Sequence, residues 1–308
     1  MLTTTKYPLR KEFRLLGKLL QAELSTGTKR AQRICEVWDL LLLTERTRYL
    51  NFGYWVDGCE IVDDACEAMV DLVGRAAELK PGDRVLDAGF GYGEQDVRWL
   101  ETTGVSEIVG VNITPLHVRE ARRLAQAKGV ADRVRFLQGS ATELTFGAET
   151  FDKVVSIEAL VQFAPRQKFL EHAHRVLRPN GIFAVTDIIP LTAQENQTPT
   201  AAKQKWEKDS FFNGTSKENW YAADEYSRRL TALGFTDVTI RSIRDDVWEP
   251  WRRYMVSRID DPAFKARISR MIYPTYRKYL LDEVGQRVAG QPMAQADYVL
   301  VVARKPER

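Results

Sequence analysis

The stretch Val85-Leu-Asp-Ala-Gly-Phe-Gly-Tyr-Gly93 decides the fold of this chain. It is an apolar run that ends in the acid Asp87 and continues into a glycine-rich turn. Three glycines follow at alternate positions, namely Gly89, Gly91 and Gly93. Residues 81–83 before the run carry a turn signal, and residues 94–102 after it have the pattern of a helix. Because glycine has no side chain, a strand–glycine turn–helix unit brings backbone unusually close to a ligand.

The spacing of these glycines, G-x-G-x-G, lacks the third glycine position of a dinucleotide-binding fingerprint. It therefore favours a nucleoside-like ligand that has no pyrophosphate.

Strands and helices alternate outward from this unit, which is the signature of a parallel sheet covered on both faces. Strands are predicted at 84–87, 107–111, 134–138, 152–157, 182–188, 237–243 and 296–303. Helices are predicted at 60–79, 94–102, 114–129, 166–177 and 222–233. Two segments interrupt the alternation: a polar stretch with aromatic residues at 190–220, and a helical stretch rich in aromatics and arginine at about 248–282.

Composition and charge are those of an ordinary globular protein. The 308 residues are 44% hydrophobic and 28% charged, with a net charge of +3, which is too small to indicate a nucleic-acid partner. No apolar run is long enough for a transmembrane helix, and no signal-peptide core is present, so the expected location is the cytoplasm. Three cysteines without a ligand-like spacing predict neither a disulfide framework nor a metal site.

The N-terminal segment is strongly basic. Residues 1–34 carry eight basic side chains against two acids, and leucines at 15, 16, 19 and 20 give the segment an apolar helical face. Such a helix packs over a pocket or a neighbouring subunit in a homo-oligomer. Alternatively, it makes peripheral contact with a membrane or attracts an anionic substrate.

Taken together, these motifs resemble the class I S-adenosylmethionine (SAM)-dependent methyltransferases of the small-molecule, natural-product type. Pieces outside the generic cofactor motifs are similar to macrolide-sugar O-methyltransferases of the erythromycin type. They are Leu50–Trp55, Gly139–Thr142, Phe146–Asp152, Asp187–Leu191, Glu218–Trp220, Ser242–Asp245 and Glu249–Trp251. The resemblance implies an α/β, Rossmann-like fold of seven strands in which the last strand forms a hairpin beside the sixth.

The resemblance also implies a division of the chain. We expect an N-terminal helical segment at 1–48 as a lid or oligomerisation element, and a SAM-binding core at 49–189. A lid insertion at 190–221 follows, and residues 222–308 complete the core and carry the helical cap insertion.

By this resemblance, SAM is the cofactor and S-adenosylhomocysteine its product. The implied cofactor contacts are Asp87 for the ammonium group, the turn of Gly89, Gly91 and Gly93 for the carboxylate, Asn112, Ile113 and His117 for the ribose, Ser140 and Ala141 for the adenine, and Tyr54. Asn112 departs from the family, which commonly has an acid at this position for the ribose hydroxyls.

Methyl transfer is expected at the end of the fourth strand. Glu158 is the ionisable side chain placed to act as a base or to stabilise a cation, and Gln162 stands where the resembling enzymes carry a histidine. Aromatic side chains predict a pocket for a bulky, partly apolar acceptor: Tyr49, Trp55, Phe163, Trp206, Phe212, Trp220, Trp248 and Trp251.

Three functions remain open from the sequence. The first is O-methylation of a small molecule of specialised metabolism. The second is C-methylation of an isoprenoid, such as a prenyl diphosphate or a sterol-like alkene, with aromatic faces stabilising the cation and arginines of the cap binding the diphosphate. The third is a non-catalytic module that binds SAM or lipid.

Overall fold

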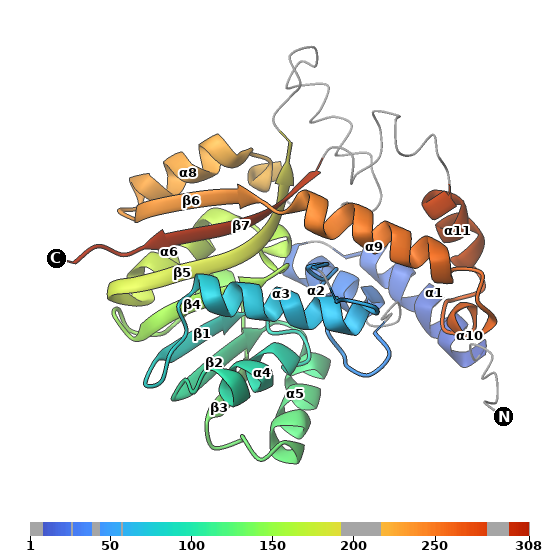
Figure 1. Ribbon diagram of the computed structural model, residues 1–308, viewed down its shortest axis with the longest axis horizontal. Coiled ribbons are helices and arrows are strands. Elements are labelled where there is room, and N and C mark those ends of the chain that lie inside the picture. The colour runs from blue at the N-terminus through green and yellow to red at the C-terminus, as the bar shows by residue number, and fades with distance from the viewer. Residues whose placement is uncertain are drawn as a thin grey trace, which may run out of the picture.

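A computed structural model shows a single mixed sheet of seven strands with helices on both faces (Figure 1). The strand order is β3-β2-β1-β4-β5-β7-β6, with β1 to β5 parallel and β7 antiparallel between β5 and β6. This order confirms the predicted α/β, Rossmann-like fold and the hairpin of the last two strands. The structure describes residues 9–25, 27–38, 44–56, 58–191, 217–281 and 296–307.

The strands lie close to the predicted positions. They are β1 Arg84–Ala88, β2 Glu107–Asn112, β3 Val134–Gln138, β4 Phe151–Ile157, β5 Leu177–Pro190, β6 Thr236–Ser242 and β7 Ala296–Arg304. The helices are α1 Leu9–Glu23, α2 Gly27–Trp38, α3 Val62–Ala76, α4 Glu94–Thr102, α5 Pro115–Ala127, α6 Arg166–Val176, α8 Ala223–Ala232, α9 Arg244–Arg258, α10 Pro262–Lys265 and α11 Tyr273–Leu281. Helix α9 thus begins four residues before the expected start of the cap at about 248.

Two hydrophobic cores sandwich the sheet. Helices α3, α4, α5 and α9 contribute to the core on one face, and α6 and α8 to the core on the other. The central strands are buried on both faces, so they read as continuous apolar runs instead of alternating ones. Most of the expected lid insertion at 190–221, namely residues 192–216, lies outside the described residues, and the proposed division into core, lid and cap stays a prediction.

Residues 178–181, between the predicted helix and the predicted strand, belong to strand β5. Strand β5 already begins at Leu177, directly after α6, and its pairing with β4 jumps from Leu177 to Ile182. The residues between these two pairs are not paired with β4. Asn180 among them has φ 63°, a left-handed conformation that asparagine tolerates.

A buried ion pair joins three parts of the fold. Arg166, the first residue of α6, contacts Asp187 of β5 at 2.9 Å, and both side chains are fully buried. The guanidinium also lies near the rings of Tyr221 and Tyr226, at 4.9 and 5.2 Å from their centroids. The pair therefore ties the loop after β4 to β5 and to the segment that enters α8.

We expect Asp187→Asn to lower the free energy of unfolding by about 3–5 kcal/mol, because it leaves a buried guanidinium without its counter-charge. The measurement is urea denaturation. The matched control is Asp260→Asn, which removes the same charge from the exposed pair of Asp260 with Arg277 and should leave the midpoint nearly unchanged. Equal midpoints for both variants would contradict the structural importance of the buried pair.

Candidate active site

The carboxyl ends of β1, β2 and β3 meet at one edge of the sheet, and backbone hydrogen bonds link them. The amide of Gly89, after β1, donates to the carbonyl of Val111 in β2 at 2.8 Å. The amide of Gly139, after β3, donates to the carbonyl of Asn112 at 3.1 Å. Strand order reverses between β1 and β4, so this edge is the switch point at which open α/β sheets bind ligands.

The glycine turn requires glycine for both conformation and space. Gly89, Gly91 and Gly93 all have positive φ, at 88°, 57° and 82°. A Cβ on Gly89 would lie 2.3 Å from the Cβ of Ala159 in the loop after β4. The turn after β1 and the loop after β4 are thus in direct contact, and backbone amides at the start of α4 are left close to any ligand there.

Asp87 lies at the end of β1 in a fully buried acidic pair. Its Oδ2 accepts a hydrogen bond from Gln95 at 2.7 Å, and its second polar partner is the carboxyl group of Asp96. Burial raises the pKa of Asp87 to about 7. Burial and the neighbouring charge of Asp87 raise the pKa of Asp96 well above its usual value. Asp96 therefore keeps its proton at neutral pH, and Asp87 is the member of the pair that loses its proton first.

Asn112 and His117 lie together at the end of β2. Asn112 Oδ1 accepts from the amide of Thr114 at 2.9 Å, and its Nδ2 lies 3.4 Å from His117 Nδ1. His117 is buried, with its ring 4.7 Å from that of Tyr92 in the glycine turn. The structure thus brings both predicted ribose contacts to the turn after β1, and Ile113 lies between them in sequence.

Ser140 and Ala141 follow β3 in a short 3₁₀ helix, η2 (Ala141–Glu143). Ser140 caps this helix, because its hydroxyl accepts from the amide of Thr142 at 3.2 Å. Ala141 is buried in the core. Since Gly139 bonds to Asn112, the predicted adenine contacts lie next to the predicted ribose contacts.

Glu158 stands at the end of β4 in a strained backbone conformation, with φ 53°. Its amide donates to Thr186 Oγ1 at 3.1 Å. The hydroxyl of Thr186 donates to that of Tyr298, which in turn donates to Glu158 Oε1. Phe52 adds a second donor to the same oxygen through its amide, at 2.9 Å. This closed ring from β4, β5 and β7 fixes the carboxyl group.

The second oxygen of Glu158, Oε2, has no donor among the described residues. Burial raises the pKa of Glu158 to about 8, although the two hydrogen bonds to Oε1 oppose that shift. The carboxyl group is therefore mostly protonated at pH 7 and loses its proton just above, which is the range suited to a general base.

Gln162 ends the 3₁₀ helix η3 (Leu160–Gln162), one turn after Glu158. Its Oε1 is buried without a donor among the described residues, so it is an unused acceptor in this loop. Phe163 follows, with its ring tip 3.7 Å from the position of a Cβ on Gly89. The predicted catalytic loop therefore touches the glycine turn.

The predicted aromatic pocket is only partly assembled. Phe52 contacts Trp248 and Trp251 of α9 edge to face, at 4.9 and 5.1 Å between ring centroids, and Trp248 contacts Tyr298 at 5.2 Å. Both tryptophans are therefore close to Glu158. Sequence reasoning missed Phe52, Thr186 and Tyr298, because nothing in their local spacing marks them.

Other predicted pocket residues lie differently. Trp55 stacks on Tyr254 at 5.1 Å, and the buried Tyr49 has Glu67 of α3 and Glu94 of α4 as its charged neighbours. Tyr54 and Trp220 pack against the core on the α3 side of the sheet. Trp206 and Phe212 lie outside the described residues.

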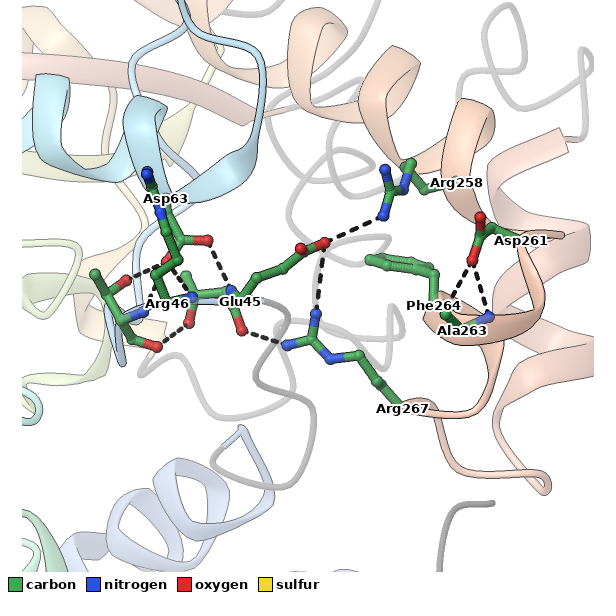
Figure 2. Close-up of polar contacts among 10 residues, drawn as sticks. Glu45, Arg46, Asp63, Arg258, Asp261, Ala263, Phe264 and Arg267 are labelled. Carbon is green, nitrogen blue, oxygen red and sulfur yellow. Dashed lines mark hydrogen bonds and ion pairs between the residues drawn. The ribbon is translucent and has the colours of Figure 1, made fainter. Parts of the chain in front are cut away.

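Most arginines of the cap are paired with acids or carbonyls. Figure 2 shows Arg258 and Arg267 converging on Glu45, at 3.2 and 3.7 Å, and Arg267 also donates to the carbonyl of Thr44. Arg252 pairs with Glu249, and Arg277 pairs with Asp260. The expectation that these arginines bind a diphosphate finds no support in this arrangement.

The segment at residues 44–47, which contains Glu45, is hydrogen-bonded to α3. The carboxylate of Asp63 accepts hydrogen bonds from the amides of Glu45, Arg46 and Thr47, at 2.7 to 3.0 Å (Figure 2).

In the part of the chain that the structure describes, no group of three or more His, Cys, Asp and Glu side chains is arranged to bind a metal ion.

Comparisons with known proteins agree with this geometry. A family model described as a methyltransferase domain matches residues 79–231. Erythromycin 3''-O-methyltransferase of Saccharopolyspora erythraea is 41% identical over 266 residues, which cover 85% of each chain. The chain belongs to the SAM-dependent methyltransferases. 27-O-demethylrifamycin SV methyltransferase of Amycolatopsis mediterranei is 34% identical, over 84% of this chain and 90% of the relative.

Solved structures show the same fold at lower identity. The mycolic acid cyclopropane synthase with bound S-adenosylhomocysteine has a TM-score of 0.70 and 21% identity, over 86% of this methyltransferase and 93% of that chain. The geranyl diphosphate C-methyltransferase of Streptomyces coelicolor has a TM-score of 0.63 and 16% identity, over 91% and 100%.

The residues at the sheet edge of this methyltransferase fit SAM. Asp87 is a buried carboxyl group at the end of β1, whose negative charge an ammonium group would neutralise, and the glycines at positive φ bring the backbone amides at the start of α4 to the same edge. Asp96 and Gln95 complete this end of the site, and sequence reasoning missed both. The signal that could have found them is an acid in the first turn of the helix that follows the motif. The assignment of each residue to a part of SAM stays a prediction.

We expect Gly89→Ala to abolish SAM binding measured by calorimetry, because its Cβ would overlap Ala159 and push apart the glycine turn and the loop after β4. Gly129→Ala is the matched control. Gly129 also has positive φ, at 70°, but no atom lies within 4 Å of its added Cβ. The control should lose about 1 kcal/mol of stability and keep its SAM affinity. Normal affinity in Gly89→Ala would refute the placement of SAM at this turn.

Proposed function

We propose that this methyltransferase O-methylates a hydroxyl group of a bulky, partly apolar natural product, of which a macrolide glycoside is the leading example. The observation that carries the proposal is Glu158, a carboxyl group fixed by the ring of Thr186 and Tyr298, with a pKa of about 8 and no donor to its second oxygen among the described residues. The 41% identity with erythromycin 3''-O-methyltransferase over 85% of both chains supports it.

In this proposal, SAM supplies a methyl group that its positive sulfonium already activates. Asp87 and the glycine turn hold the methionine end, Asn112 and His117 face the ribose, and Ser140 and Ala141 face the adenine. Glu158 accepts the proton of the acceptor hydroxyl through Oε2 as the new O–CH₃ bond forms. The electrons of the breaking bond return to sulfur, which leaves the methyl ether and S-adenosylhomocysteine as products.

Gln162 orients the acceptor in place of a histidine. Its buried Oε1 can accept a hydrogen bond from a second hydroxyl of the acceptor, but an amide takes up no proton. The proton of the reacting hydroxyl therefore goes to Glu158. The remaining catalysis is alignment, which the rigid loop after β4 provides.

C-methylation of an isoprenoid is the second candidate. It is favoured by the aromatic rings of Phe52, Trp248 and Tyr298 next to Glu158, since such rings stabilise a passing carbocation. It is disfavoured because five of the six arginines of the cap are paired with acids, which leaves Arg270 as the one cap arginine whose guanidinium has no acidic partner among the described residues. The expectations that the protein is located in the cytoplasm and that it forms a homo-oligomer stay predictions.

A substrate panel with methyl-labelled SAM tests the proposed class. Macrolide glycosides, prenyl diphosphates and fatty acids are incubated separately and analysed by mass spectrometry. We expect a gain of one labelled methyl in a hydroxyl-bearing macrolide glycoside only. Label in the hydrocarbon of a prenyl diphosphate would replace the proposal with the second candidate.

The pH dependence of turnover tests Glu158. We expect kcat/KM for the acceptor to rise as pH passes about 8, because only the deprotonated carboxylate accepts a proton. Glu158→Gln should lower kcat by about 10²–10⁴-fold with SAM affinity retained. Tyr298→Phe removes a donor that stabilises the carboxylate, so its profile should move to higher pH.

Tyr273→Phe is the control for this series. It removes the hydroxyl that bonds Asp260 in the cap and should leave the profile unchanged. A Glu158→Gln variant with normal turnover would remove Glu158 from the mechanism.

A further inference from the structure

Helix α1 carries an apolar stripe that faces solvent along its whole length. Of the ten large apolar side chains that are exposed in the described residues, six lie between residues 9 and 24. They are Leu9 (67% exposed), Phe13 (72%), Leu16 (42%), Leu19 (37%), Leu20 (62%) and Leu24 (79%). Five of them follow the spacing of four, three, four and four residues that places side chains on one face of a helix.

The opposite face of α1 fixes this orientation. Glu12 is buried and accepts hydrogen bonds from the hydroxyl of Ser269, at 2.5 Å, and from the amide of Arg270. Leu15 is fully buried, and Lys18 pairs with Glu36 of α2. The helix is therefore docked on the cap with its apolar stripe turned outward, beside α10 and α11 at the end of the molecule that holds the N terminus (Figure 1).

The charges around the stripe are mainly positive, because two of the three acids of α1 and α2 turn inward. Glu12 is held by the cap, and Glu36 is held by Lys18 and Arg33. Arg10, Arg14 and Lys29 are exposed, against the single exposed acid Glu23. An apolar stripe flanked by cations complements an anionic lipid surface.

We propose that α1 is a docking surface for an anionic membrane, on which it lies in the plane of the interface. None of the described helices is long and apolar enough to cross a bilayer, so the contact is peripheral. The aliphatic and aromatic side chains of the stripe enter the acyl boundary, while Arg10 and Arg14 bind headgroup phosphates. This surface is independent of the acceptor that the active site takes.

A second copy of the chain fits the stripe less well. Two antiparallel α1 helices that met on this stripe would bring both copies of Arg14 to the same flank, near the two-fold axis. Like charges would then face each other at the centre of the contact. A lipid headgroup instead neutralises them.

Vesicle sedimentation of the full chain tests the proposal. We compare vesicles of phosphatidylcholine that contain about 30% of the anionic lipid phosphatidylglycerol with vesicles of pure phosphatidylcholine. The anionic vesicles attract basic side chains strongly. We expect the protein to pellet with the anionic vesicles and to remain soluble with the neutral ones. Phe13→Asp with Leu20→Asp should lower the partition coefficient by about a hundredfold, because two buried apolar side chains are lost.

Charge variants measure the electrostatic contribution to vesicle binding. Arg10→Glu with Arg14→Glu should lower the partition coefficient by about tenfold or more. Arg119→Glu with Arg123→Glu changes the same charge on α5, where both arginines are exposed, and should bind like the parent. SAM affinity measured on every variant verifies that the chain is folded.

Results of two kinds would overturn the proposal. One is a parent protein that stays in the supernatant with all vesicles, or aspartate variants that pellet as well as the parent. The other is a parent that is dimeric without vesicles and becomes monomeric on Phe13→Asp with Leu20→Asp, which would assign the stripe to a second copy of the chain.

Discussion

The buried pair of Arg166 and Asp187 is the interaction on which the site depends most. A guanidinium removed from water is tolerated only because a carboxylate, two carbonyls and two tyrosine rings surround it. The amide of Arg166 donates to Asn219 Oδ1 at 2.7 Å, and Asn219 Nδ2 returns to the carbonyl of Phe163 at 2.5 Å. The loop after β4, which carries the proposed base, is thus held at its far end by polar contacts with a fixed geometry.

The near end of that loop is held by the ring of Glu158, Thr186 and Tyr298. Such a ring needs three strands in register, since each residue comes from a different one. It restrains a carboxyl group whose backbone is already strained, so the strain persists only because the surroundings determine it. The same ring explains why a buried acid is retained here, although burial disfavours its charge. A base for hydroxyl chemistry needs a pKa close to the working pH, and burial supplies that shift.

Two acidic groups at the sheet edge thus serve different proposed tasks through different surroundings. The Asp87–Asp96 pair holds at most one negative charge, where an ammonium group would bind, whereas Glu158 must lose its own proton before it can accept one from a hydroxyl group. The cap is connected to the segment at 44–47 by the contacts of Arg258 and Arg267 that Figure 2 shows. These contacts restrain the cap. These contacts leave the aromatic residues of α9 as the part of the cap that lies near Glu158.

The sequence by itself determined the sheet, the glycine turn and the position of Glu158 at the end of β4. Apolar runs that end in glycine or acid define parallel strands whatever surrounds them, and glycines at positive φ can be replaced by few other residues. Only the tertiary structure decided what Glu158 contacts, that Asp87 has Asp96 as its neighbour, that most cap arginines are paired, and which face of α1 is exposed. Each of these depends on residues far apart in the chain, such as Phe52 and Tyr298, which meet Glu158 through packing that no local pattern records.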